Sequence, residues 1–146
     1  MNMSFLVKDY MNKEIQTIED TATIMEAAKT IDKTKGGLLV ILKSGKPIGV
    51  VTEYDFVKKA LIKKMDPSKE LVGEIKSEPI ISVDPDEDLL KASEIMKKNN
   101  IRRLPVSRNG ILYGIITAKD IATQCGLYTD QLTKDLVRWS SLFPII

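Results

Sequence analysis

The sequence predicts a mixed α/β (α+β) fold made of two copies of one β-α-β-β-α unit, followed by a C-terminal helical extension. The main observation is an internal duplication, clearest in Gly49–Asp55 (Gly-Val-Val-Thr-Glu-Tyr-Asp) and Gly114–Asp120 (Gly-Ile-Ile-Thr-Ala-Lys-Asp). The same offset of 65 residues aligns residues 7–57 with 72–122 without a gap. A gapless repeat indicates two copies of one supersecondary unit packed on each other. Strand and helix patterns alternate inside each copy, and a helical apolar pattern follows in the tail.

The first copy shows a local signal for each of its elements. Thr23-Ile24-Met25-Glu26 has the spacing of a helix capping box, and apolar residues follow at i, i+3, i+4 and i+7. Leu38–Leu42 is an apolar run too short for a helix, which predicts a buried strand. Ser44-Gly45 predicts the turn into the next strand. The remaining predicted elements are the strands Ile15–Ile18 and Ile48–Val51 and the helix Tyr54–Lys64, with Phe56, Val57, Ala60 and Leu61 expected to be buried.

The second copy repeats this order. Asp88 is the expected cap of a helix whose apolar stripe is Leu89, Ala92 and Met96. Asn109-Gly110 is a strong hairpin signal because both residues tolerate a positive φ angle. The other predicted elements are the strands Ile80–Val83, Leu104–Val106 and Tyr113–Ile116, and a helix from about Lys119.

The duplication divides the chain into a first motif at residues 1–65, a second motif at residues 66–127 and a tail at residues 128–146. Met65–Lys69 reads as the linker between the two motifs. The tail has helical spacing in Leu132, Leu136 and Trp139. It either covers part of the protein's own core or forms an interface with a second subunit or a target.

Composition excludes several classes of function. The 146 residues carry 22 basic and 20 acidic side chains, and this balance argues against a dedicated nucleic-acid binder. No apolar run approaches the roughly 20 residues that cross a bilayer, and no signal peptide is evident, so we expect a cytoplasmic protein. The chain has no histidine and a single cysteine, Cys125, which excludes imidazole chemistry and a multi-thiolate zinc site. We find no nucleophile–base pair or metal-ligand set and expect no enzyme.

The repeated pattern Gly-apolar-apolar-Thr-x-x-Asp places a threonine where a strand becomes a helix. The aspartate lies one turn into that helix, on the same face as the threonine hydroxyl. A carboxylate can accept two hydrogen bonds from a vicinal diol, so a ribose fits beside the aspartate. Thr-x-x-Asp is also a capping-box variant, and capping and ligand binding can coexist. The presence of two copies at one offset favours a function beyond capping.

The ordered set of motifs resembles the CBS domain, a module named from cystathionine β-synthase that normally occurs in tandem pairs. The resemblance covers about Val7–Leu127. It rests on Val7-Lys8-Asp9-Tyr10-Met11, Glu26-Ala27-Ala28 and Lys91-Ala92-Ser93, Leu39-Val40-Ile41 and Leu104-Pro105-Val106, and the two Gly-x-x-Thr-x-x-Asp endings. It implies two units packed with pseudo-twofold symmetry, with two clefts between them that commonly hold AMP, ADP, ATP or S-adenosyl compounds such as S-adenosylmethionine.

The resemblance also implies which residues contact such a ligand. The ribose-binding aspartate corresponds to Asp55 and Asp120, and the neighbouring hydroxyl to Thr52 and Thr117. The first strand of each unit often frames the adenine, which implies Ile15, Thr17, Ile80 and Ser82. Some nucleotide-sensing relatives carry a His-Arg pair before the middle strand, where this chain has Thr34-Lys35 and Asn99-Asn100. The candidate phosphate contacts are therefore Lys35, Arg102, Arg103 and Lys119.

The leading hypothesis is a stand-alone regulatory module that binds an adenosine ligand and modulates a separate effector protein. The resemblance also implies a homodimer, because relatives pair through their helical faces. The alternative is a scaffold that dimerises and binds a partner without any ligand. Neither hypothesis involves a catalytic residue, a metal ion, nucleic acid or a membrane.

Overall fold

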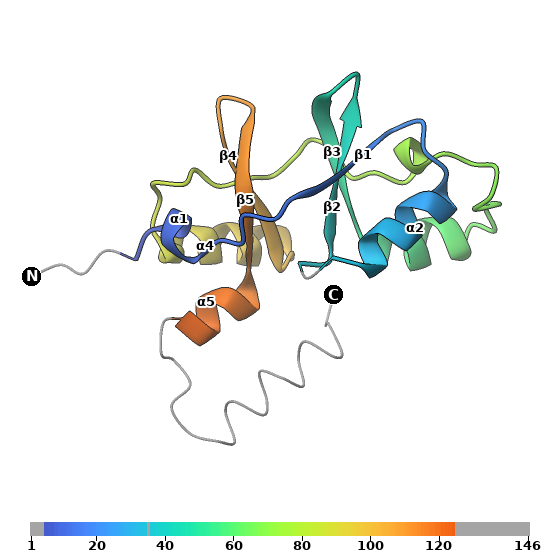
Figure 1. Ribbon diagram of the computed structural model, residues 1–146. Helices are drawn as coiled ribbons and strands as arrows, with labels where there is room; N and C mark the ends of the chain where they lie inside the picture. The colour runs from blue at the N-terminus through green and yellow to red at the C-terminus, as the bar shows by residue number, and fades with distance from the viewer. Residues whose placement is uncertain (1–4, 35, 125–146) are drawn as a thin grey trace, which may run out of the picture. The chain divides into compact units, whose positions relative to one another are not determined.

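Figure 1 shows a computed structural model of the chain. It describes residues 5–34 and 36–124. The described residues form two compact units. The first, which we call the continuous unit, comprises residues 14–81. The second, which we call the composite unit, joins residues 5–13 to residues 82–124. Each unit combines helices with a small sheet, and the predicted mixed α/β fold with two β-α-β-β-α-like units is confirmed.

The continuous unit is built on a three-stranded sheet. Strand β1 (Gln16–Glu19) runs parallel to β2 (Leu38–Lys43), and β2 pairs antiparallel with β3 (Lys46–Thr52). The first four residues of the central strand β2 are buried, as their unbroken apolar sequence predicts. Ser44 and Gly45 both adopt a positive φ angle, 51° and 79°, in the turn between β2 and β3. The predicted turn at Ser44-Gly45 is confirmed.

Helix α2 (Ile24–Asp32) covers this sheet and begins at the predicted capping box. The Glu26 N–H donates to Thr23 Oγ1 (3.1 Å), and the Thr23 N–H donates to Glu26 Oε2 (2.9 Å). Two orphan amides at the helix start are thereby satisfied. The apolar stripe of α2 packs into the core with residues of β2, β3 and the following segment: Ile24, Ala27, Ile31, Leu39, Ile41, Val51, Ala60, Val72 and Ile75.

The helix predicted after β3 is present but differs in type and in burial. A single turn, α3 (Glu53–Asp55), continues into the π-helix η1 (Phe56–Leu61). Only Ala60 of this π-helix is buried, with Phe56 partly buried beside it, so one i, i+4 pair faces the core. The prediction that Val57 and Leu61 are buried is wrong, because they lie one position past that pair and are 53% and 72% exposed.

The composite unit contains helix α4 (Leu89–Asn99), the antiparallel pair β4 (Arg103–Arg108) and β5 (Ile111–Thr117), and helix α5 (Ala118–Gln124). Asp88 caps α4 as predicted, accepting from the Lys91 N–H at 2.8 Å. Asn109 and Gly110 take the predicted positive φ angles, 52° and 77°. The core of this unit consists of Val7, Val83, Leu89, Ala92, Met96, Leu104, Val106 and Ile116.

The strand predicted at Ile80–Val83 is wrong, since only Val83 makes a bridge, parallel to Val106. The cause lies in β4, where Pro105 takes the place that Val40 has in β2. The Pro105 carbonyl accepts the Val83 N–H at 3.0 Å, but proline has no N–H to donate back to this segment. The ladder that holds β1 beside β2 is therefore reduced to a bridge in the composite unit.

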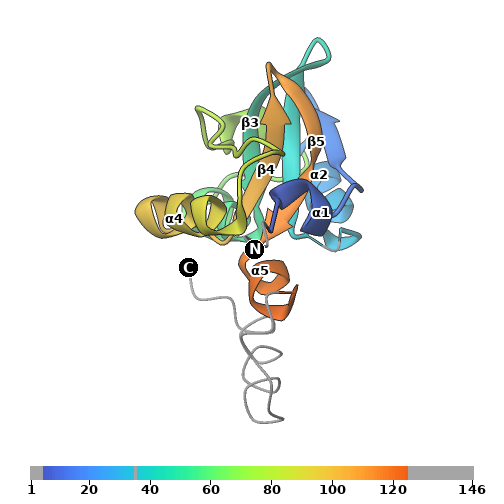
Figure 2. The same cartoon turned by 90° about the vertical axis from the view of Figure 1, so that its left-hand side faces the viewer.

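Each repeat opens with a segment that packs on the other repeat. We call residues 7–13 and 72–78 the leading segments; they contain α1 (Val7–Tyr10) and the 3₁₀ helix η2 (Val72–Glu74). Asn12 exchanges two backbone hydrogen bonds with Ile115, and Ser77 exchanges two with Val50. Figures 1 and 2 show α1 beside β5 within the composite unit. Val7 and Val72 are fully buried, so each leading segment fills the core of the unit it joins.

The compact units therefore group the chain differently from its sequence repeats. The division at residues 1–65 and 66–127 describes the duplication and stays a prediction. The predicted tail helix within residues 128–146, together with Cys125 and Lys35, lies outside the described residues.

The repeated glycine is explained by the leading segments. A Cβ atom on Gly49 would lie 2.9 Å from the Ser77 carbonyl oxygen. A Cβ atom on Gly114 would lie 2.6 Å from the Asn12 carbonyl oxygen. These distances are too short for any side chain, so glycine at this position of the motif makes room for the crossing backbone.

Candidate functional site

The two Thr-x-x-Asp motifs form similar corners, each within its own unit. The first corner is Thr52 at the end of β3 and Asp55 in α3; the second is Thr117 at the end of β5 and Asp120 in α5. The threonine N–H donates to the aspartate Oδ2 in both, at 2.9 Å and 3.1 Å. In the second corner, the Asp120 N–H also donates to Thr117 Oγ1 at 3.0 Å. Both aspartates are therefore helix caps, and this role uses their Oδ2 atoms.

The first corner is filled by side chains of its own unit. Lys59 Nζ lies 3.0 Å from Asp55 Oδ1, and the Ser77 hydroxyl donates to the same oxygen at 3.4 Å. Asp55 is only 5% exposed and is the one buried charged residue among those that the structure describes. The carboxylate thus accepts hydrogen bonds on both oxygens, all from this chain.

Lys59 is itself held in place by several acceptors. Its ammonium group donates to the Ile75 carbonyl at 3.1 Å and to Ser77 Oγ at 3.0 Å, besides the ion pair with Asp55. The Lys76 carbonyl lies at a longer distance of 3.5 Å, so the acceptors are sufficient for the three N–H donors of an ammonium group. All of them except Asp55 come from the leading segment that joins this unit.

The second corner has different neighbours. Asp120 is half-buried, and within the described residues its carboxylate has a single donor, the Thr117 N–H. The residue four positions on is Gln124, where the first repeat has Lys59. Thr117 pairs with Arg103 across β4 and β5, and the Arg102 carbonyl accepts the Ala118 N–H at 2.8 Å. The backbone of this arginine pair therefore borders the second corner, whereas Gly37 and Leu38 stand at the same places in the first repeat.

The other predicted site residues are spread over both units. Ile15 precedes β1 and Thr17 is exposed within it, both in the continuous unit. Ile80 belongs to the continuous unit and Ser82 to the composite unit, where the Ser107 hydroxyl donates to Ser82 Oγ at 2.8 Å. Lys119 is exposed in the first turn of α5. The role of these side chains in binding stays a prediction.

Sequence reasoning missed Lys59 and Ser77. The i, i+4 spacing of Asp55 and Lys59 was a usable signal, because opposite charges at this spacing pair on a helix. Ser77 had no local signal, since its approach to Asp55 depends on how the leading segment crosses β3.

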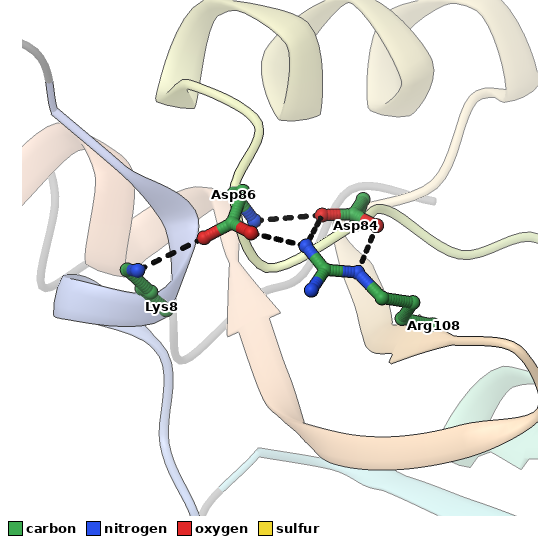
Figure 3. A network of polar contacts seen from close by, with 4 residues as sticks. All are labelled: Lys8, Asp84, Asp86 and Arg108. Carbon is green, nitrogen blue, oxygen red and sulfur yellow. Dashed lines mark hydrogen bonds and ion pairs between the residues drawn. The ribbon is translucent and has the colours of Figure 1, made fainter.

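A second polar cluster lies at the far end of β4. Arg108 donates through Nε and Nη2 to Asp84 (2.9 Å and 2.7 Å) and also pairs with Asp86, which binds Lys8 at 2.9 Å (Figure 3). The hydrogen bonds from Arg108, followed by that from the Asp86 N–H, lower the pKa of Asp84 from 3.8 to about 2. Lys8, Asp86 and Arg108 border an open pocket of about 530 Å³, which is also lined by Met11, Lys13 and Tyr113. Acids and bases neutralise each other here, so the cluster ties the strand end to the loop before α4.

The described residues contain neither a candidate metal site nor a candidate membrane span. Among them, no group of three or more histidine, cysteine, aspartate or glutamate side chains is placed to hold a metal ion. No helix in this part of the chain is both long and apolar enough to span a bilayer.

The family model of the CBS domain matches the chain twice, at residues 7–62 and 72–125. The chain belongs to the CBS-domain family. Each match includes one Thr-x-x-Asp motif near its C-terminal end. The resemblance predicted from the motifs is confirmed.

The chain is also similar to proteins of known sequence. The chain is 33% identical over 120 residues to an uncharacterized protein of Methanopyrus kandleri, a match that covers 81% of this chain. It spans 61% of that relative's length and 42% of the length of a second relative, from Methanocaldococcus jannaschii.

Two solved structures are informative about CBS pairs. The CBS domain pair of protein MJ0100, in complex with 5′-methylthioadenosine and S-adenosyl-L-methionine, is 32% identical and has a TM-score of 0.76. That match covers 85% of this chain and 98% of the other. A hexameric CBS-CP12 protein from bloom-forming cyanobacteria is 26% identical, with a TM-score of 0.77, and covers 96% of this chain and 80% of the other.

Proposed function

We propose that this chain is a regulatory module that binds an adenosine ligand at a Thr-x-x-Asp corner and transmits its occupancy to a partner protein. The observation that carries the proposal is the second corner. Asp120 Oδ2 accepts the Thr117 N–H, the Asp120 N–H donates to Thr117 Oγ1, and Asp120 is half-buried. A carboxylate oriented in this way suits a pair of ribose hydroxyls, which donate hydrogen bonds.

The ligand class is supported by the similarity to a CBS pair that holds two adenosine compounds. The backbone of Arg102 and Arg103, two of the candidate phosphate contacts, lies beside Thr117 and Ala118, and this position supports a ligand with a negative charge. AMP, ADP, ATP and S-adenosylmethionine all remain within this class, and they differ in the charge attached to the ribose.

Thermal denaturation in the presence of each of these four compounds tests the proposal. A ligand present at a hundred times its dissociation constant stabilises the native state by about 2.7 kcal/mol. For a protein of this size, we expect the midpoint of unfolding to rise by several degrees. Guanosine 5′-monophosphate is the matched control, because it keeps the ribose phosphate and changes only the base. No shift with any adenosine compound at millimolar concentration would favour the scaffold function instead.

The same proposal includes self-association through the exposed face of η1. Val57, Leu61 and the adjacent Ile62 are 53%, 72% and 63% exposed, and they form an apolar run on one short helical segment. Exposed apolar patches of this kind mark interaction sites. The similarity to a hexameric CBS protein supports a second copy of this chain as the occupant.

Light scattering at micromolar concentration measures this association directly. The wild-type chain is expected to show at least the mass of a dimer. Leu61→Glu is expected to lower it, because a charge cannot be buried in an apolar interface. Leu90→Glu is the control, since Leu90 is similarly exposed (68%) but lies on α4. A monomeric wild type, or equal effects of the two variants, would contradict the assignment of this face.

A further inference from the structure

We propose that Lys59 is an internal occupant of the first corner, so that Asp120 is the carboxylate that takes the ligand and Asp55 binds only when Lys59 is displaced. This inference rests on the proposed function and assigns its two corners unequal roles. It makes Lys59 the residue that determines how many ligands the chain binds.

The contacts of Asp55 leave little room for a diol. A carboxylate has about four acceptor positions. In Asp55 three are used, by the Thr52 N–H, the Lys59 ammonium and the Ser77 hydroxyl. A ribose needs two positions on one carboxylate, and Asp55 is 5% exposed. Lys59 therefore has to leave Asp55 before a ribose can bind in the family's manner.

The ion pair is not required for the corner to form. The second corner makes the same bond from the threonine N–H to the aspartate Oδ2. In the sequence, the position equivalent to Lys59 is Gln124, a neutral residue. The cap is thus independent of the cation. Lys59 adds a contact to a corner that already closes without it.

Lys59 also links the first corner to the leading segment at residues 72–78. Its ammonium group bridges Asp55 to the Ile75 carbonyl and to Ser77, so three parts of the continuous unit meet at one atom. Ser77 has Asn12 as its equivalent in the composite unit, 65 residues earlier. The composite unit thus has a carboxamide where the continuous unit has the hydroxyl that contacts both Lys59 and Asp55.

Calorimetric titration of four chains tests the assignment. AMP, ATP and S-adenosylmethionine are each titrated separately into the wild type, Asp120→Ala, Lys59→Gln and Lys59→Gln/Asp120→Ala. Glutamine is chosen because the chain carries it at the equivalent position. We expect one site per chain in the wild type, its loss in Asp120→Ala, and two sites in Lys59→Gln. In the double variant, the first corner is expected to bind at least about tenfold more tightly than in Asp120→Ala, a change of 1.4 kcal/mol.

Lys63→Gln is the matched control, since it removes the same charge from an exposed position one turn further along. It is expected to leave the stoichiometry unchanged. Ser77→Ala is a second route to an open corner, should Lys59→Gln fail to fold, and is expected to tighten the first corner in the Asp120→Ala background.

Two equal sites in the wild type, or weaker binding in Lys59→Gln, would overturn the role of Lys59. The second result would instead make Lys59 a phosphate contact. No binding of any of the three compounds by any of the four chains would overturn the proposed function itself, and the role of Lys59 with it.

Discussion

The two corners carry one motif in two different surroundings. In both, threonine and aspartate cap the turn from strand to helix. In the first, Lys59 and Ser77 complete the coordination of the carboxylate inside the protein; in the second, Gln124 and Asn12 stand at the equivalent positions. The motif therefore specifies a local backbone structure. The side chains that contact the Asp55 carboxylate, Lys59 and Ser77, lie outside the motif, four and twenty-two positions further along the chain.

The largest expected difference between the corners concerns stability. Asp55→Ala leaves the Lys59 ammonium partly buried without its anion, and breaking such a pair costs about 3 kcal/mol, at the lower end of the range because Lys59 keeps some exposure. Asp120→Ala removes only a cap and costs about 1 kcal/mol. Urea denaturation of both variants measures the two free energies of unfolding.

Asp55→Ala/Lys59→Met is the control for this comparison. It removes both charges and is expected to recover most of the stability lost in Asp55→Ala. Equal losses in Asp55→Ala and Asp120→Ala would mean that both aspartates act only as caps.

The glycines that face the leading segments give the next effect. Gly114→Ala and Gly49→Ala are each expected to destabilise the fold by about 1–3 kcal/mol, because the new methyl group meets a backbone carbonyl that cannot rotate away. The loss is expected to be greater at Gly114, where the Cβ distance is 2.6 Å compared with 2.9 Å at Gly49.

Gly110→Asn is the control for these two, since nothing lies within 4 Å of that position and asparagine tolerates its positive φ angle. A Gly114→Ala chain as stable as the wild type would show that the leading segment does not cross β5 as described.

Exchanging the residue types at positions 40 and 105 tests why the continuous unit has a three-stranded sheet and the composite unit a two-stranded one. Val40→Pro removes the N–H that the central strand donates towards β1, and is expected to cost about 0.5–1.5 kcal/mol for one lost hydrogen bond. Pro105→Val supplies that donor in the composite unit. Hydrogen exchange is expected to show less protection in β1 of the first variant and more protection around Val83 in the second. No change around Val83 would mean that proline is not what limits the strand.

The smallest expected effect is a pH-dependent contribution to stability from the ion pairs around Arg108, which is lost at low pH. The folded-state pKa of Asp84 is lowered to about 2, so its contribution to stability is complete above its ordinary value of 3.8 and is lost as the pH falls through about 2. Arg108→Gln should therefore be less stable than the wild type at pH 6, and the difference should vanish near pH 2. Added salt should shrink it as well, because the groups are exposed. A difference that persists at pH 2 would exclude the ion pair as its source.

Much of this fold could be predicted because its signals are local. The capping residues Thr23 and Asp88 and the turn at Asn109-Gly110 occur where the sequence indicates them. The strand at Ile80–Val83 was predicted wrongly because its pairing depends on Pro105 in another strand. The burial of Val57 and Leu61 was predicted wrongly because only Phe56 and Ala60 of this segment pack on the core. The corners were found from their repetition, but the closure of the first by Ser77 depends on a long-range crossing that no local pattern encodes.

The leading segments also constrain how the protein is made. Residues 14–81 form one unit that is continuous in sequence, so it can fold as soon as that stretch has emerged from the ribosome. Residues 5–13 emerge earlier, yet Val7 packs in a core completed only by β5, more than a hundred residues later. The composite unit can therefore be completed only after β5 has been synthesised. While β5 is still being synthesised, the continuous unit can already be folded, but residues 5–13 do not yet have the strand on which they pack.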